Sequence, residues 1–234
     1  MSSEGIRKNV TEIRERIAAS AAKAGRPAEE ITLMGVSKTH PCEAIREAFE
    51  AGVRHFGENR VQEWEGKRGG VEDLPGNWHL IGHLQSNKAT RAAKMFHSVD
   101  SVDDFTLAQR LDRARAEVQE QGKLRVLIEV KVAAEETKSG VEKEQLPEFA
   151  EKILTLQRLE LAGLMCIPPL LEDVEKVRPY FAELRKLNEQ LAVHLGRKLP
   201  VLSMGMSHDF EVAIEEGATE VRVGTALFGV RETR

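Results

Sequence analysis

Cysteine is almost absent from the chain, because Cys42 and Cys166 are the only two among 234 residues. Two cysteines cannot form the disulfide framework of a small secreted domain, and no C-x-x-C spacing supports a redox pair. So few cysteines, alongside six methionines, fit a reducing compartment. We therefore expect the protein in the cytoplasm.

Long apolar runs and an excess of one charge are absent as well. No stretch approaches the roughly 18 uncharged apolar residues that mark a transmembrane helix, and residues 1–20 lack the apolar core of a signal peptide. The formal net charge is −4, so no overall field attracts nucleic acid or an anionic membrane. We therefore expect neither a nucleic acid nor a membrane as a partner.

Apolar segments instead alternate with helical patterns along the chain. Apolar residues recur every three or four positions over residues 4–24, which predicts a helix. Eight later segments are predicted as strands: 31–38, 53–57, 78–83, 95–100, 124–132, 159–167, 200–205 and 219–224. Strands that alternate with helices imply parallel βαβ units. Eight such units in this length fit a closed (β/α)8 TIM barrel better than an open sheet. We predict one α/β domain over 1–234, with an extra N-terminal helix at 1–25 and the barrel at 31–229.

One lysine stands at the end of an apolar strand, in "ITLMGVSK" (31–38). Strand alternation places Met34, Val36 and Lys38 on one face, and barrel active sites lie at the carboxyl ends of the strands. If that face is the barrel interior, desolvation lowers the pKa of Lys38 and supplies the neutral amine that a Schiff base needs. The alternative is a lysine that leaves the strand and is solvated.

The last two strand ends are rich in glycine, serine and threonine, in "SMGMSHDF" (203–210) and "RVGTALFG" (222–229). In many barrels the loops after strands 7 and 8 bind phosphate through backbone N–H groups. We assign such a site to six residues: Ser203, Gly205, Met206, Ser207, Gly224 and Thr225. The alternative is two tight turns that merely precede helices.

A phosphate site opposite a buried lysine fits two ligand classes. One is a phosphosugar held by an aldolase-type lysine, and the other is pyridoxal 5′-phosphate (PLP), whose aldehyde condenses with lysine. Arg222 shares the face of Gly224 and would point inward. It could bind phosphate, or lie beside the pyridine nitrogen and weaken PLP as an electron sink. The alternatives are a pair with an interior carboxylate and exposure at the rim.

Three further residues adjoin the same strand ends, and each has a structural alternative. Asn59 either packs beside a planar ring or caps a helix. His79 either contacts the cofactor or is a hydrogen-bonded core residue. His83 lies about 13 Å from His79 along a strand, too far for one metal ion, so we expect no metal. Met165 either packs under an aromatic ring or belongs to the core.

Seven motifs together resemble the pyridoxal phosphate homeostasis protein family. In order they are "GVSKTH", "HFGENRVQEW", "WHLIGHLQSNK", "HSVDS", "ETKSG", "GLMCIPP" and "LSMGMSHDFEVAIEEGATEVRVGTALFG". The resemblance implies a single barrel like the N-terminal domain of alanine racemase, with PLP on Lys38 as a Schiff base. It implies that Ser203–Ser207 and Arg222–Thr225 bind the phosphate, and that Asn59, His79 and Met165 surround the ring. One departure is Lys131, where many relatives carry asparagine.

The resemblance also implies a role in vitamin B6 balance without established turnover. Racemases and decarboxylases of this barrel type resemble dimers in which a second, mostly β domain completes the site. This sequence ends ten residues after Gly224, and its only tyrosine, Tyr180, precedes strand 7. We therefore expect a monomer that carries PLP, with PLP-dependent apoenzymes as recipients. The alternatives are a weak or narrow PLP-dependent amino-acid racemase and a phosphosugar aldolase.

Overall fold

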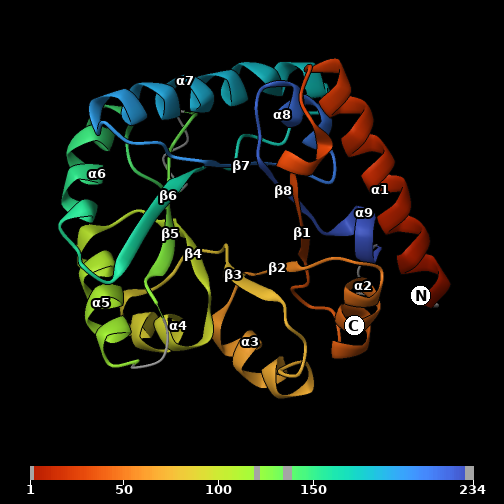
Figure 1. Cartoon of the computed structure of the whole chain (residues 1–234), viewed down its shortest axis with the longest axis horizontal. Helices are drawn as coiled ribbons and strands as arrows, with labels where there is room; N and C mark the ends of the chain where they lie inside the picture. Colours follow the sequence, from red (N-terminus) through yellow and green to blue (C-terminus); the bar gives the residue numbers. More distant parts are fainter. Residues whose placement is uncertain (1–2, 119–121, 134–138, 230–234) are drawn as a thin grey trace.

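The computed structural model describes residues 3–118, 122–133 and 139–229 of the chain. In this described part of the chain, eight parallel strands pair in sequence order and close into a barrel, because β1 also pairs with β8 (Figure 1). The strands are β1 (Thr32–Val36), β2 (His55–Glu58), β3 (Asn77–Leu80), β4 (Ser98–Val102), β5 (Leu124–Glu129), β6 (Leu159–Met165), β7 (Val201–Met206) and β8 (Glu220–Val223). The predicted TIM barrel with an extra N-terminal helix is confirmed.

Helices surround the strands on the outside of the barrel (Figure 1). They are α1 (Ser3–Lys23), α2 (Cys42–Glu50), α3 (Val61–Lys67), α4 (Ala89–Met95), α5 (Phe105–Ala116), α6 (Leu146–Leu154), α7 (Arg178–His194), α8 (Phe210–Glu215) and α9 (Thr225–Phe228). Short 3-10 turns are η1 (Ala28–Glu30), η2 (Arg68–Gly70), η3 (Ser86–Lys88), η4 (Lys143–Gln145) and η5 (Val174–Val177). Within the described residues, no helix is both long and apolar enough to cross a membrane.

The extra helix α1 completes the outer layer beside a short final helix. The stripe of Ile6, Val10, Ile13 and Ile17 is at most 4% exposed, and α1 packs against α2, α8 and α9. Helix α9 has only four residues, too few to cover its share of the sheet. Burial of each apolar side chain of this size contributes about 1.5–3 kcal/mol, so the stripe explains why α1 docks here.

Several predicted boundaries differ from the observed ones, for local reasons. The first strand ends at Val36 and not at Lys38, because Thr39 adopts a left-handed φ of 66° and turns the chain. The fifth strand ends at Glu129, and only an isolated bridge between Val130 and Val141 continues it. The second strand, predicted to end at residue 57, extends through Glu58, and α3 begins at Val61.

Candidate functional site

A cavity of about 720 Å³ opens at the carboxyl ends of the strands, within the range of small-molecule sites. Its walls come from the ends of β1, β2, β3, β5, β6, β7 and β8 or the loops that follow them. The cavity brings together many of the residues singled out from the sequence: Val36, Lys38, Asn59, Met206, Ser207, Arg222, Gly224 and Thr225. Parts of the chain almost 190 residues apart, such as Lys38 and Thr225, therefore face one space.

Lys38 lies half-buried on this cavity, immediately after β1. Met34, Val36 and Ile81 form a separate buried apolar cluster, and Val36 and Ile81 also line the cavity. The lysine therefore stands over an apolar floor. A β-branched residue in the left-handed region costs of order 1–3 kcal/mol, so the φ of 66° at Thr39 marks local strain next to Lys38.

A second lysine holds the backbone on both sides of Lys38. Lys67 Nζ donates to the carbonyl oxygen of Ser37 at 2.8 Å and pairs with Glu58 at 2.8 Å and Glu63 at 3.0 Å. Glu58 also accepts from the Ser37 hydroxyl at 2.7 Å, and Glu63 accepts from the Thr39 N–H. This network offsets the strain at Thr39 and fixes the direction of the intervening residue.

The two acids of this network are in different electrostatic states. Burial raises the pKa of Glu58 above its usual value, although Lys67 and the Ser37 hydroxyl act to lower it. Burial also acts on the pKa of Glu63, but the Thr39 N–H and Lys67 outweigh it and hold that pKa below its usual value. Glu58 is fully buried, so its ionised form depends on the charge of Lys67 to offset the cost of burial.

Arg222 is a buried arginine, 4% exposed, that reaches the cavity from β8. One guanidinium nitrogen donates to the Ser203 hydroxyl and the other to the Cys166 carbonyl oxygen, each at 2.7 Å. Both acceptors are neutral, so these bonds orient the guanidinium without cancelling its charge. The arrangement fits binding of an anion or of a ring nitrogen better than the alternative of an ion pair with an interior carboxylate.

The loops after β7 and β8 are joined directly by Ser207. Its hydroxyl accepts the N–H of Gly224 and the N–H of Ala226, both at 3.2 Å. In the same loop the N–H of Met206 donates to Asp209 at 2.6 Å. The two loops predicted to bind phosphate therefore form one continuous wall of the cavity.

Four predicted residues are not among the described residues that line the cavity: His79, Met165, Ser203 and Gly205. Ser203 acts through Arg222, as described above. Met165 is fully buried in a cluster with Leu127 and Ala162. His79 bonds with His55 and Asp100 inside the barrel. For His79 and Met165 the structure therefore shows the core contacts of the structural alternative.

Gly205 has a packing role that its place in the loop sequence did not indicate. Its φ is 93°, and a Cβ there would lie 2.6 Å from the Cβ of Ala213 and 2.9 Å from the Cα of Phe210. Only glycine lets α8 approach β7 this closely. The residue therefore shapes the phosphate-loop wall from behind.

Asn59 and His83 also line the cavity. The N-cap residue of α3, which begins at Val61, is Arg60, so Asn59 does not cap that helix. The His83 side chain is 57% exposed and lies 3.7 Å from Asp103. His79 and His83 therefore point at different partners.

Glu129 is a cavity residue that was not predicted from the sequence. It is the last residue of β5, lines the cavity and is only 6% exposed. Burial and the nearby charge of Asp103 raise its pKa to about 7, although Arg222 acts to lower it. An acid at the end of the apolar run "VLIE" is the same signal that singled out Lys38, so the sequence did contain it.

Lys131, the departure noted in the sequence, also lines the cavity. Its amine pairs with Glu142 at 2.7 Å, so it adds a partly neutralised cation to the rim. Residues 136–138 of the "ETKSG" motif lie outside the described residues.

The chain is similar in sequence to a family model and to curated proteins over nearly its full length. A model of the alanine racemase N-terminal domain matches residues 6–232. The chain is 47% identical to the pyridoxal phosphate homeostasis protein of Aquifex aeolicus, covering 95% of this chain and 97% of that protein. It is 46% identical to the protein of the same name from Pseudomonas aeruginosa, covering 97% and 96%.

Solved structures give the same result. PipY of Synechococcus elongatus PCC7942, in a structure with PLP bound, superposes with a TM-score of 0.81 at 41% identity, covering 93% of this chain and all of that one. Alanine racemase of Clostridium difficile 630 superposes with a TM-score of 0.74 at 16% identity and shares the fold alone. The superposition covers 98% of this chain but only 58% of that racemase chain.

Proposed function

The chain belongs to the pyridoxal phosphate homeostasis protein family, and on that premise we propose that it binds PLP in the cavity and takes part in vitamin B6 balance. The observation that carries the proposal is the meeting of Lys38, Arg222 and the joined loops of Ser207 and Gly224 in one cavity. The PLP-bound PipY structure, 41% identical over 93% of this chain, supports the same ligand.

The residues present fit the three chemical parts of PLP. The apolar floor of Val36 and Ile81 suits an aromatic ring, and the wall joined by Ser207 suits a phosphate. Lys38 supplies an amine at the same cavity. Bound PLP supplies an aldehyde that condenses with an amine and a ring that accepts electrons.

The work of the protein's own residues is to place and hold these groups. Lys67 and its two acids fix the turn that carries Lys38. Ser203 and Cys166 orient Arg222, whose permanent charge faces the cavity. We propose that Lys38 attaches the cofactor covalently and that Arg222 faces either the phosphate or the ring nitrogen.

We propose further that the protein is a carrier without turnover, acting as a monomer with one barrel domain over 1–234 as its functional unit. The name of the curated relatives supports a role in homeostasis. PLP-dependent apoenzymes would receive the cofactor. Cys42 and Cys166, both in the described part of the chain, form no disulfide, which supports a cytoplasmic location.

One observation favours a second candidate, a weak PLP-dependent amino-acid racemase. Glu129 lines the cavity with a pKa of about 7, which suits a group that takes and returns a proton near neutral pH. Exchange of the α-hydrogen of amino acids in deuterated water distinguishes the two functions. A carrier exchanges this hydrogen at the rate of free PLP, whereas stereospecific exchange that Glu129→Gln abolishes would establish the racemase.

Binding is tested by titrating the protein with PLP and with pyridoxal while the absorbance of the covalent complex is followed. We expect pyridoxal to bind at least about tenfold more weakly, because charge-assisted bonds to the phosphate contribute about 1.5–3 kcal/mol each. Lys38→Ala should lose the covalent band. Lys131→Ala is the matched control, since Lys131 lines the same cavity, and it should keep the band. Equal affinity for both ligands would show that the phosphate site lies elsewhere.

Carriage is tested by transfer of the cofactor to a PLP-dependent apoenzyme. The loaded protein should restore the activity of the apoenzyme, and Lys38→Ala, loaded under the same conditions, should restore less. Restoration at the same rate by free PLP released into solution, measured across a dialysis membrane, would contradict direct transfer.

A further inference from the structure

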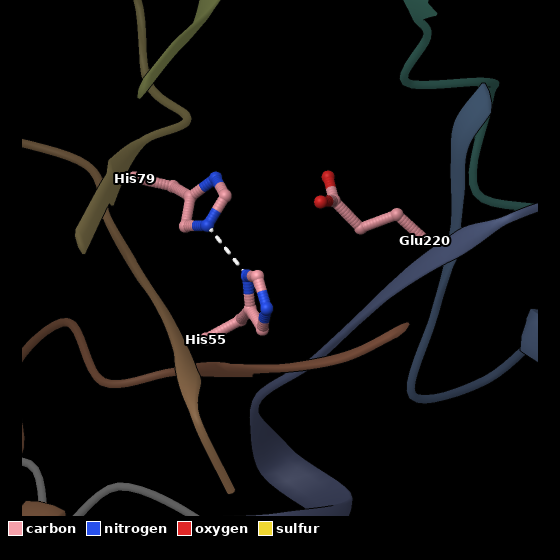
Figure 2. Close-up of side chains that lie close together, drawn as sticks. All are labelled: His55, His79 and Glu220. Atoms are coloured by element: carbon pink, nitrogen blue, oxygen red, sulfur yellow. Dashed lines mark hydrogen bonds between the residues drawn. The ribbon is translucent and has the colours of Figure 1, made fainter. Parts of the chain in front are cut away.

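Two histidines and a glutamate meet inside the barrel at its amino-terminal end, away from the cavity. His55 and Glu220 are the first residues of β2 and β8, and His79 is in β3. Figure 2 shows the carboxylate of Glu220 directed toward the two imidazole rings. One ligand atom from each residue lies within 4.8 Å of the other two. Sequence spacing indicated only His83 as a partner for His79, and it did not indicate this group.

The ring of His79 is already oriented in the way that metal-binding histidines are. Its Nδ1 lies 3.0 Å from a carboxylate oxygen of Asp100, and Asp100 also accepts from the hydroxyl of Ser98. A carboxylate only accepts, so Nδ1 of His79 carries the proton and Nε2 presents a lone pair. Carboxylate-to-histidine bonds of this kind fix the tautomer and raise the basicity of the ligand nitrogen.

Among the described residues, the carboxylate of Glu220 has one oxygen that is free to bind a ligand. Its residue is 2% exposed, and Oε2 accepts from Arg125 at 2.9 Å. Its other oxygen, Oε1, is buried without a hydrogen-bond partner among the described residues. A buried and unsatisfied carboxylate oxygen is costly. The two carboxylates, Asp100 and Glu220, carry one more negative charge than Arg125 balances.

We propose that Nδ1 of His55, Nε2 of His79 and a carboxylate oxygen of Glu220 bind one divalent first-row metal ion, with Zn²⁺ as the reference cation. Two imidazoles and a carboxylate are a zinc donor set, with a water as the fourth ligand. Nitrogens at about 2.0–2.1 Å from one tetrahedral ion lie about 3.3 Å apart. The observed separation of 2.9 Å between the two nitrogens needs only a small opening, and the flexible Glu220 chain closes the remaining distance.

Proton balance on binding is simple. In the structure as it stands, Nδ1 of His55 donates to the lone pair of His79 Nε2. When the ion takes both nitrogens, the Nδ1 proton of His55 moves to Nε2 of the same ring, so neither histidine changes its charge. His55 is half-buried, so solvent can exchange this proton and admit the ion. The bound ion would join β2, β3 and β8 and close the amino-terminal end of the barrel.

The test is a calorimetric titration of the chelator-treated full chain with ZnCl₂. We expect one saturable site per chain. His55→Gln keeps an amide that can donate to His79 but removes the ligand nitrogen, and it should weaken binding by at least about 100-fold, the upper end of the loss caused by removing a supporting partner alone. Glu220→Gln, which keeps the volume of the side chain, should weaken binding by at least about tenfold.

A surface histidine provides the matched control. His194 lies on α7 and pairs with Glu151 at 2.8 Å, and His194→Ala should leave Zn²⁺ binding unchanged. No saturable binding by the parent protein, or binding that survives His55→Gln, would overturn the proposal, and loss on His194→Ala would move the ion to the surface. PLP absorbance and circular dichroism of each variant confirm folding, and because the cavity is a separate site, the metal result does not depend on the proposed PLP function.

Discussion

Lys67→Met removes the cation behind Lys38 and leaves the carboxylate of Glu58 buried without it. Glu58 is fully buried, and its side chain has two polar partners among the described residues, Lys67 at 2.8 Å and the Ser37 hydroxyl at 2.7 Å. Removal of one partner of a buried pair costs about 3–5 kcal/mol. Glu58 can instead take up a proton, which at pH 7 costs about 3 kcal/mol for an acid whose ordinary pKa is 4.5. Because burial already raises the pKa of Glu58 in the parent, this cost is an upper limit, and we expect the variant to lose up to about 3 kcal/mol at pH 7.

The sign of the pH dependence follows from linkage. In the variant the folded state holds a proton on Glu58 that the unfolded state releases above pH 4.5. The difference in stability between parent and variant should therefore shrink as the pH falls, to about 1 kcal/mol at pH 5. Urea denaturation followed by circular dichroism at pH 7 and pH 5 measures both values.

Lys152→Met is the matched control, because Lys152 pairs with Glu148 at 2.6 Å on the surface of α6. It removes the same charge from an exposed pair and should change the urea midpoint little at either pH. The double variant Lys67→Met, Glu58→Gln should recover most of the lost stability at pH 7. A loss at Lys67 no larger than that of the control, or a loss that does not shrink at pH 5, would refute this account of the network.

Three other changes have direct expectations. Gly205→Ala should cost about 2–4 kcal/mol in urea denaturation, because contact of its Cβ with α8 adds about 1–3 kcal/mol to the cost of a left-handed φ. Gly196→Ala, with a φ of 61° and open space around it, should cost about 1 kcal/mol, and equal costs would contradict the packing argument. Glu129→Gln should stabilise the cofactor-free protein by about 3 kcal/mol at pH 8 and hardly at pH 4.5. The folded-state pKa of Glu129 is raised to about 7, so its carboxylate destabilises the folded state only when the pH rises above the ordinary pKa of 4.5. A gain in stability that does not depend on pH would exclude titration of Glu129. Ser207→Ala should weaken PLP about tenfold and leave pyridoxal affinity unchanged, because Ser207 organises the phosphate loops, and an equal loss for both ligands would place its effect elsewhere.

The barrel could be predicted from the sequence because each strand and helix has its own apolar pattern within a short segment of the chain. Period-two and period-3.6 apolar patterns alternate along the chain, and the strands pair with their sequence neighbours. Strand ends were less accurate, because they depend on single backbone conformations. Thr39 ends the first strand early by adopting a left-handed conformation, which the residue type does not indicate because threonine rarely adopts it.

The cavity was predicted in part, for the same reason. Lys38, Ser207 and Arg222 follow from their positions at strand ends, and the barrel topology brings strand ends together. Lys67 was missed because its role depends on contacts with Ser37, 30 residues away. His55 was missed because only the pairing of β2 with β3 places it beside His79. The period of an apolar pattern predicts a helix or a strand, but it does not show which side chains meet across neighbouring strands.

The proposed covalent attachment of PLP to Lys38 can be tested by trapping the bound cofactor. The protein is incubated with PLP, reduced with borohydride and digested, and the peptides that carry the pyridoxyl group are mapped by mass spectrometry. We expect one modified peptide per chain, with the group on Lys38, and none in Lys38→Ala. Modification of Lys131, which lines the same cavity, with Lys38 left unmodified would contradict this attachment.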